Sequence, residues 1–218
     1  MSVSVMILHR DSSLIVCEKP VGVSSESPGL PELLSEQAGL KVWPVHRLDQ
    51  GTGGVVVFAL SSQCCAALQR LFLNSEVNKE YLAVVSGLPA ESFGIWEDLL
   101  WHDRTRNKTY VVKSPRKGVK EARCEWEILS SVQCGGQTLS LVRVRLHTGR
   151  THQIRVQFAS RKFPLVGDRK YGSRVPADTV ALWSSEIGFP HPDGKSGAVC
   201  VRSAPPSVFP WNLFSSRK

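Results

Sequence analysis

Short apolar runs rich in β-branched residues recur along the chain, and they constrain its fold more than any other feature. Runs of this length, continuous or alternating, are typical of buried and half-buried strands. Between Leu139 and Leu146, valines alternate with Arg143 and Arg145, which predicts a strand with one apolar and one cationic face. The predicted strands are Val3–Leu8, Leu14–Cys17, Gly54–Leu60, Tyr81–Val85, Thr109–Lys113, Cys124–Leu129 and Leu139–Leu146.

Helical periodicity is found in fewer segments. Apolar residues such as Leu68 and Phe72 recur at helical spacing in Ser61–Glu76, and the same spacing appears briefly in Pro31–Ala38 and Thr151–Ser160. Because the predicted strands outnumber the predicted helices, we expect an α+β fold. Its core would be a large, mainly antiparallel mixed β-sheet with helices packed on it.

Nothing in the sequence marks a boundary between domains. The chain has no internal repeat, no low-complexity tract and no long linker rich in Pro, Gly and Ser. The richest turn region, Phe189–Gly197, is too short to separate two domains. With 218 residues the chain can bury a sizeable core, so we expect a single domain over residues 1–218.

The charge balance favours a polyanionic partner. Lys and Arg number 27 against 19 Asp and Glu, which gives a net charge of +8 and a sequence pI of about 9.4. Nucleic acid is the first candidate for such a protein. Charge alone does not decide the matter, since many small proteins without a nucleic-acid ligand are as basic.

Cysteine usage and hydropathy predict a cytoplasmic protein without a membrane partner. The N-terminal apolar residues are interrupted by His9, Arg10 and Asp11, unlike those of a signal peptide, and no segment approaches the ~20 apolar residues of a membrane span. The cysteines lack the spacing of a zinc site or a disulfide framework, which favours reduced thiols. They are Cys17, Cys64, Cys65, Cys124, Cys134 and Cys200.

The segment 102–123 concentrates positive charge, because its many Lys and Arg are balanced only by Asp103 and Glu121. We interpret it as a basic loop or hairpin. Its candidate RNA contacts are Arg104, Arg106 and Lys108. The alternative is a solvated connection without a partner, since charged runs usually face water.

Three segments carry the candidate chemistry. In His46–Gly54, Asp49 stands between a short strand signal and a glycine-rich turn, although an Asp in a turn can also simply cap backbone amides. Gly149–Val156 places two Arg, one His and one Gln at a predicted helix start, which favours an anion site or, alternatively, a merely solvated helix face. Pro164–Gly172 is typical of a structural turn.

Together these segments closely resemble the motifs of the RluA-type family of RNA pseudouridine synthases. Lys19–Gly22 and Lys79–Tyr81 match further positions, and the resemblance covers roughly residues 7–172. The family's first motif is His-Arg-Leu-Asp, two variable residues, then Thr-Ser-Gly. Here Gly53 stands in place of the Ser, a departure that we expect to alter the packing of the turn and to leave Asp49 in place.

The resemblance implies roles for individual residues. Asp49 matches the essential catalytic Asp, Tyr81 the residue that packs against the target uracil, and Arg155 the residue that pairs with the catalytic carboxylate. The implied fold is a bent mixed sheet with a central active-site cleft. Supporting or RNA-contacting roles are implied for His46, Arg47, Thr52, Arg150, His152 and Gln153.

The implied activity is isomerisation of specific uridines in structured RNA, ribosomal or transfer RNA, to pseudouridine. It requires no metal or redox cofactor, and the carboxylate could act as a nucleophile at the anomeric carbon or assist glycosidic cleavage. Two alternatives are a non-catalytic RNA-binding module of the same fold and a metal-dependent hydrolase using Asp49 with His46, His147 and His152. The hydrolase lacks a two-His helix motif or a carboxylate cluster.

RNA selection is expected to reside in the catalytic domain itself. The chain starts almost directly in the segment that resembles the family, which leaves no room for a separate N-terminal RNA-binding domain. Loops such as the basic segment 102–123 would then determine which RNA is bound. We expect a monomer whose partner is RNA.

Overall fold

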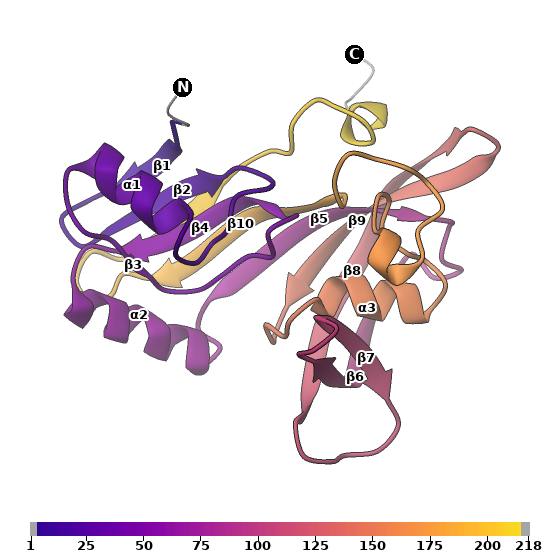
Figure 1. Ribbon diagram of the computed structural model, residues 1–218, viewed down its shortest axis with the longest axis horizontal. Helices are drawn as coiled ribbons and strands as arrows, with labels where there is room; N and C mark the ends of the chain where they lie inside the picture. Colours follow the sequence, from indigo (N-terminus) through magenta and orange to yellow (C-terminus); the bar gives the residue numbers. More distant parts are fainter. Residues whose placement is uncertain (1–3, 215–218) are drawn as a thin grey trace. The chain divides into compact units, whose positions relative to one another are not determined.

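The computed structural model describes residues 4–214 and divides into two compact units. The first comprises residues up to 79 together with 183–205, and the second comprises 80–182 together with residues from 206 onward. The units contain helices and strands, most of which are labelled in Figure 1. In chain order they are β1 (Met6–Arg10), β2 (Leu14–Lys19), α1 (Leu30–Ala38), β3 (Trp43–Pro44), β4 (Gly53–Ala59), α2 (Ser62–Leu73), β5 (Asn78–Ser86), β6 (Phe93–Asp103), β7 (Lys108–Val112), β8 (Val119–Cys134), β9 (Gln137–Leu146), α3 (Gln153–Ser160), η1 (Arg169–Tyr171), β10 (Leu182–Pro190), β11 (Ala198–Arg202) and η2 (Trp211–Leu213).

The first unit is built on a mixed sheet. β2 pairs antiparallel with β1 and β4, β10 runs parallel to β4, and β11 pairs antiparallel with β10. Every residue of β4 is buried, as expected for a central strand with a continuous apolar run. α2 runs along this sheet (Figure 1) and contributes Cys65 and Leu68 to a core that includes Val57 and Phe189.

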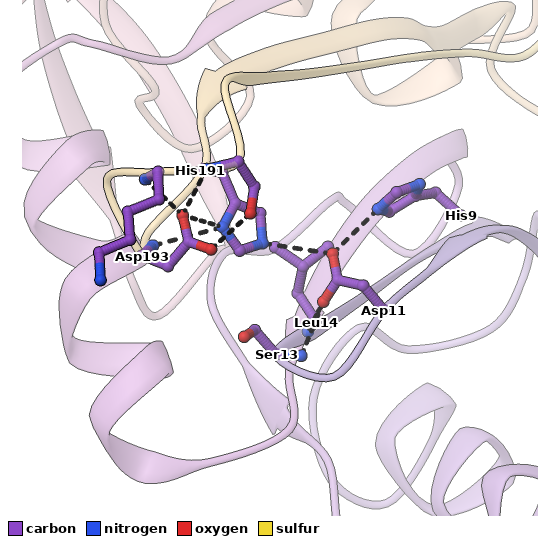
Figure 2. A network of polar contacts seen from close by, with 8 residues as sticks. His9, Asp11, Ser13, Leu14, His191 and Asp193 are labelled. Carbon is purple, nitrogen blue, oxygen red and sulfur yellow. Dashed lines mark hydrogen bonds and ion pairs between the residues drawn. The ribbon is translucent and has the colours of Figure 1, made fainter.

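A polar cluster ties the β1–β2 turn to the loop between β10 and β11 (Figure 2). The His191 ring lies between two carboxylates, with Nε2 3.3 Å from Asp11 Oδ2 and Nδ1 2.7 Å from Asp193 Oδ1. The same Asp11 oxygen is 3.1 Å from His9 Nε2, and the other accepts backbone hydrogen bonds within its own turn. These side chains therefore hold two loops of the first unit together.

The second unit contains an antiparallel sheet in the order β5-β9-β8-β6-β7. α3 lies beside β6 and β7 (Figure 1). Its Phe158 is fully buried, and the ring centroid lies 4.6 Å from that of Trp96 and 6.1 Å from that of Trp126. This aromatic cluster anchors the helix to the sheet.

β9 has the two faces that its alternation predicts. Val142 and Val144 are fully buried, whereas the side chains of Arg143 and Arg145 are 42% and 51% exposed. Both arginines pair with glutamates of the neighbouring strands, at 2.8 to 3.7 Å. The cationic face of this strand is thus balanced by acidic side chains.

The predicted α+β class is confirmed, with mixed and mainly antiparallel strand pairing. Helices occur where helical spacing was found, at Leu30–Ala38, Ser62–Leu73 and Gln153–Ser160. Between residues 4 and 214, no helix is long and apolar enough to cross a membrane.

Candidate active site

Asp49 lies in the turn that leads into β4 of the first unit. Thr52 N donates a 2.9 Å hydrogen bond to the Asp49 carbonyl oxygen, and Gly22 N donates one of the same length to the Gln50 carbonyl oxygen. The turn is therefore restrained by one hydrogen bond within it and one from the segment that follows β2, and it continues directly into a fully buried strand. Such support holds a loop side chain in a defined position.

Lys19, at the end of β2, is fully buried and supports this turn through hydrogen bonds to its backbone. Its ammonium donates hydrogen bonds to the carbonyl oxygens of Pro20, Val23 and Gln50, at 3.0, 2.7 and 3.2 Å. Burial lowers the pKa of Lys19 to about 8, an effect that the negative charge of Asp49 partly counteracts. At neutral pH a cation thus fixes the backbone next to Asp49.

Two glycines follow the turn because β10 approaches closely. A Cβ at Gly53 would lie 2.3 Å from the Trp183 ring, and one at Gly54, where φ is +107°, would lie 2.2 Å from the Ser184 carbonyl oxygen. Both contacts follow from the parallel register of β4 and β10. The Trp183 ring occupies the space that the family's Ser would need, which explains Gly53 in this chain.

We expect Gly53→Ser to lower the free energy of unfolding by about 1–3 kcal/mol, because the Trp183 ring or the strand must move. Urea unfolding measures the loss. The same substitution in a Trp183→Leu background should cost less, since the smaller side chain leaves room. An unchanged stability of Gly53→Ser would show that the turn accommodates the side chain freely.

His46 supports the turn from inside the first unit. Its ring stacks on Phe72 of α2 with centroids 4.7 Å apart, and its Nε2 accepts a 3.1 Å hydrogen bond from Val57 N. Burial, together with the positive charge of Lys79, lowers the pKa of His46 to about 3. His46 is thus neutral in the folded protein and supports β4 through the Val57 amide.

A pH dependence of stability follows from His46. Below pH 6.5 the unfolded chain takes up a proton on this residue that the folded chain, with a pKa of about 3, does not, so stability is lost as the pH falls. Between pH 7 and pH 5 we expect His46→Gln to lose about 2 kcal/mol less free energy of unfolding than the wild type, in urea titrations at both pH values. Equal losses would mean that His46 becomes charged in the folded state.

Arg47 and Thr52, the other candidates in this turn, differ in exposure. The Arg47 side chain is 60% exposed and pairs with Glu26 at 2.6 Å, a surface ion pair that an RNA phosphate can replace. Thr52 is 3% exposed and closes the turn through its backbone. Arg47 is thus accessible to RNA, whereas Thr52 is a structural residue of the turn.

In the second unit, Arg155 of α3 forms a buried, bidentate ion pair with Asp168. Nε lies 2.7 Å from Oδ2 and Nη2 lies 2.9 Å from Oδ1, and the side chains are 10% and 1% exposed. Paired hydrogen bonds of this kind fix the plane of the guanidinium as well as its position. Asp168 lies in the segment that the sequence indicated as a structural turn, so its role was missed. The only available signal was its place in the third motif.

Gln153, at the start of α3, is 2% exposed and is engaged within the protein. Its Oε1 accepts hydrogen bonds from Thr148 Oγ1 and Arg150 N, and its Nε2 donates to the Arg123 carbonyl oxygen. Gln153 therefore holds the turn before α3. Arg150 donates from Nε to the Glu121 carbonyl oxygen at 2.8 Å.

His152, the residue before α3, is 7% exposed and has a left-handed backbone, with φ at +56°. Its Nδ1 lies 2.9 Å from the hydroxyl oxygen of Tyr171. Such a conformation is unfavourable for a residue with a side chain and persists where the surroundings hold it. His152 thus supports the helix that carries Arg155.

A cavity of about 490 Å³ borders the Arg155–Asp168 pair. Its lining also includes Arg169, Lys170 and Asp178. The lining thus holds three cations and two carboxylates, and its small excess of positive charge suits an anionic ligand.

Tyr81 and the basic segment also lie in the second unit. Tyr81 is 8% exposed and stands opposite Val144 of β9. The segment 102–123 runs through the hairpin of β6 and β7 into β8, and Arg104 and Arg106 are exposed in the turn between the first two strands. Lys108 lies over the Tyr171 ring, 5.4 Å from its centroid.

Comparisons with known proteins identify the family of this chain. The family model for RNA pseudouridylate synthase matches residues 13–160, which include part of each compact unit. The chain is 33% identical over 216 residues to an uncharacterized RNA pseudouridine synthase of Aquifex aeolicus, an alignment that covers 88% of this chain and just under two thirds, 66%, of that protein. It is 34% identical over 211 residues to tRNA pseudouridine synthase C of Haemophilus ducreyi, with 85% of each chain covered.

Solved structures share the fold. Human RNA Pseudouridylate Synthase Domain Containing 1 matches with a TM-score of 0.81 and 24% identity over 94% of this chain and 85% of that one. Human RNA Pseudouridylate Synthase Domain Containing 4 matches with a TM-score of 0.75 and 23% identity over 92% and 88%. The chain therefore belongs to the RNA pseudouridylate synthase family, the enzymes that isomerise uridine in RNA to pseudouridine.

Proposed function

We propose that this RNA pseudouridine synthase modifies uridines in tRNA with Asp49 as its catalytic carboxylate. The observation that carries the proposal is the setting of Asp49, in a turn braced by backbone hydrogen bonds and next to the charged, buried Lys19. tRNA is favoured as the substrate because relatives from Haemophilus ducreyi and Vibrio cholerae are named tRNA pseudouridine synthase C.

The reaction exchanges one bond of a single nucleotide for another. The bond between uracil N1 and ribose C1′ breaks, the base turns, and C5 bonds to C1′. N1 gains a proton and C5 loses one, so the composition does not change. Asp49 can attack C1′ as a nucleophile or assist cleavage and carry the proton from C5, and both roles start from the ionised carboxylate.

Tyr81 and Arg155 carry the further roles that the family resemblance implies. The reacting atoms are inaccessible in stacked RNA, so the target nucleotide must leave the stack, at a cost of a few kcal/mol that is lower in loops. Stacking on Tyr81 would recover about 1–3 kcal/mol of this cost. The guanidinium of Arg155 would stabilise the carboxylate. The proposal includes action as a monomer in the cytoplasm. The cytoplasmic location is supported by the spacing of the cysteines, which is not that of a disulfide framework.

The experiment uses purified protein and unmodified tRNA transcripts that carry tritium at uridine C5. Because the C5 hydrogen passes to water when C5 bonds to C1′, released tritium counts turnovers. We expect release from pooled tRNA transcripts and none from ribosomal RNA fragments of matched length. Release from the ribosomal fragments alone would contradict the tRNA assignment and leave the family activity intact.

The hairpin of β6 and β7 is proposed to bind the RNA backbone. Replacing Arg104, Arg106 and Lys108 with Ala should weaken tRNA binding and reduce the slope of log K against log salt concentration by up to about 2 units, because each phosphate contact contributes about 0.7. Filter binding at several salt concentrations measures the slope. The rate at saturating RNA should fall less than the affinity, since these side chains do no chemistry.

The matched control is Arg143→Ala with Arg145→Ala, because glutamates already engage both side chains. This variant should keep the wild-type slope. If the triple variant kept the slope and the control lowered it, the RNA would follow β9 and Arg150, and the hairpin would be a solvated surface feature.

A further inference from the structure

We infer that Asp168 and Tyr171, on the turn after α3, are positioning residues for Arg155 and connect its placement to the basic hairpin. The inference rests on the proposed function, because it takes Arg155 as the arginine of the active site. Every residue involved lies in the second unit.

Asp168 fixes one edge of the guanidinium. It accepts the hydrogen bonds of Nε and Nη2, so the direction in which Nη1 points is determined by the carboxylate. The carboxylate itself sits on a tight turn. Asp168 N donates to the Leu165 carbonyl oxygen at 3.0 Å, and a Cβ at the preceding Gly167, where φ is +79°, would lie 2.1 Å from the Thr179 carbonyl oxygen.

Tyr171 packs against the face of the same guanidinium. Arg155 Cζ lies over the phenol ring, 5.1 Å from its centroid. A cation in this position is attracted by the ring as well as packed by it. Asp168 on the edge and Tyr171 on the face together restrict both the position and the tilt of the guanidinium plane.

The Tyr171 hydroxyl reaches two further elements. It accepts a 2.8 Å hydrogen bond from Thr109 N of β7, and it lies 2.9 Å from Nδ1 of His152, the left-handed residue before α3. Burial raises the pKa of Tyr171, which keeps the phenol protonated and able to donate to His152. One hydroxyl thus holds the strand of the hairpin and the start of the helix that carries Arg155.

Two more contacts tie the turn to the hairpin. Lys170 Nζ donates a 2.9 Å hydrogen bond to the Asn107 carbonyl oxygen, and Lys108 lies over the Tyr171 ring. Asn107 belongs to the same exposed turn as Arg104 and Arg106, the proposed phosphate contacts. Any movement of the hairpin on binding RNA therefore acts on the residues that hold Arg155.

The experiment compares Asp168→Asn and Tyr171→Phe with wild type in single-turnover tritium release from tRNA transcripts, alongside filter binding and thermal unfolding. We expect the rate at saturating tRNA to fall about 100-fold for Asp168→Asn, because the guanidinium loses its anchor. Tyr171→Phe keeps the ring and should lose about tenfold. The dissociation constant should change less than about threefold for both, since neither residue is proposed to contact RNA. Glu91→Gln, which makes the same change from carboxylate to amide at an exposed position of the second unit, is the matched control and should keep the wild-type rate.

The combination with Arg155→Ala separates positioning from general support of the fold. If Asp168 and Tyr171 act through Arg155, adding Asp168→Asn or Tyr171→Phe to Arg155→Ala should lower the rate by less than about twofold, whereas independent effects would multiply. If the fold-losses in rate of the single variants multiply in the combined variants, the inference is overturned. Should Asp168→Asn fail to fold, the same comparison with Tyr171→Phe decides.

The remaining outcomes distinguish this inference from the function on which it rests. Wild-type rates for Asp168→Asn and Tyr171→Phe, together with an impaired Arg155→Ala, overturn the inference and leave the proposed function standing. A wild-type rate for Arg155→Ala instead removes Arg155 from the proposed active site.

Discussion

Asp49→Asn is expected to lower the rate of pseudouridine formation by at least about 10⁴-fold, which is the usual scale for removing a group that takes part in the chemistry. The amide keeps the shape of the side chain but can neither attack C1′ nor accept a proton. Affinity for tRNA should stay within about threefold, because the substitution leaves the basic hairpin untouched. Single-turnover tritium release and filter binding on one protein preparation measure both quantities.

Glu91→Gln serves as the control for this substitution, since it also replaces a carboxylate with an amide, at an exposed position of the second unit. It should react at the wild-type rate. A rate within tenfold of wild type for Asp49→Asn would show that Asp49 is not the catalytic carboxylate. The family activity of the wild-type protein would be unaffected by that result.

Lys19→Met is expected to lower the free energy of unfolding by about 3 kcal/mol, because the buried carbonyl oxygens of Pro20, Val23 and Gln50 lose their donor. The turn that carries Asp49 loses its support at the same time, so the rate should also fall, by about 100-fold. Urea unfolding and tritium release measure the two effects.

A charge-matched control is Lys195→Met, which removes an exposed lysine of the first unit and should change neither quantity. Lys19→Arg keeps the charge, but its larger planar head does not match three converging carbonyl groups, so an intermediate loss is expected. Wild-type stability and rate for Lys19→Met would show that water replaces the ammonium and that Lys19 does not position the turn.

Much of the fold could be predicted from periodicity, and the strands that escaped prediction show why the rest could not. β10 contains the buried Ser184, whose Oγ donates to the Val55 carbonyl oxygen at 3.0 Å. In β6, Asp98 interrupts the apolar pattern, and Gln157 and Arg161 of the α3 region engage it in the folded protein. Polar residues that find partners only in the tertiary structure conceal a strand in the sequence.

The candidate site, like the fold, could be predicted only in part, because the sequence does not show which polar groups find partners in the tertiary structure. The resemblance to the family indicated Asp49, Tyr81 and Arg155 as candidates, but it could not distinguish side chains that face a ligand from those that hold the site. His46 accepts a backbone hydrogen bond inside the first unit, and the Gln153 amide is engaged within the second. Their polar groups are thus used within the protein. Asp168 was overlooked because an aspartate in a turn usually caps the backbone, and only the fold brings it to Arg155.

The central claim, that this chain makes pseudouridine with Asp49, is tested most directly by transcriptome-wide pseudouridine mapping in cells that lack the gene. Cells without the protein should lose pseudouridine at one or a few tRNA positions and nowhere else. Expression of the wild-type chain should restore those positions, and expression of Asp49→Asn at the same protein level should not. An unchanged map in the deleted cells, or restoration by Asp49→Asn, would contradict the claim.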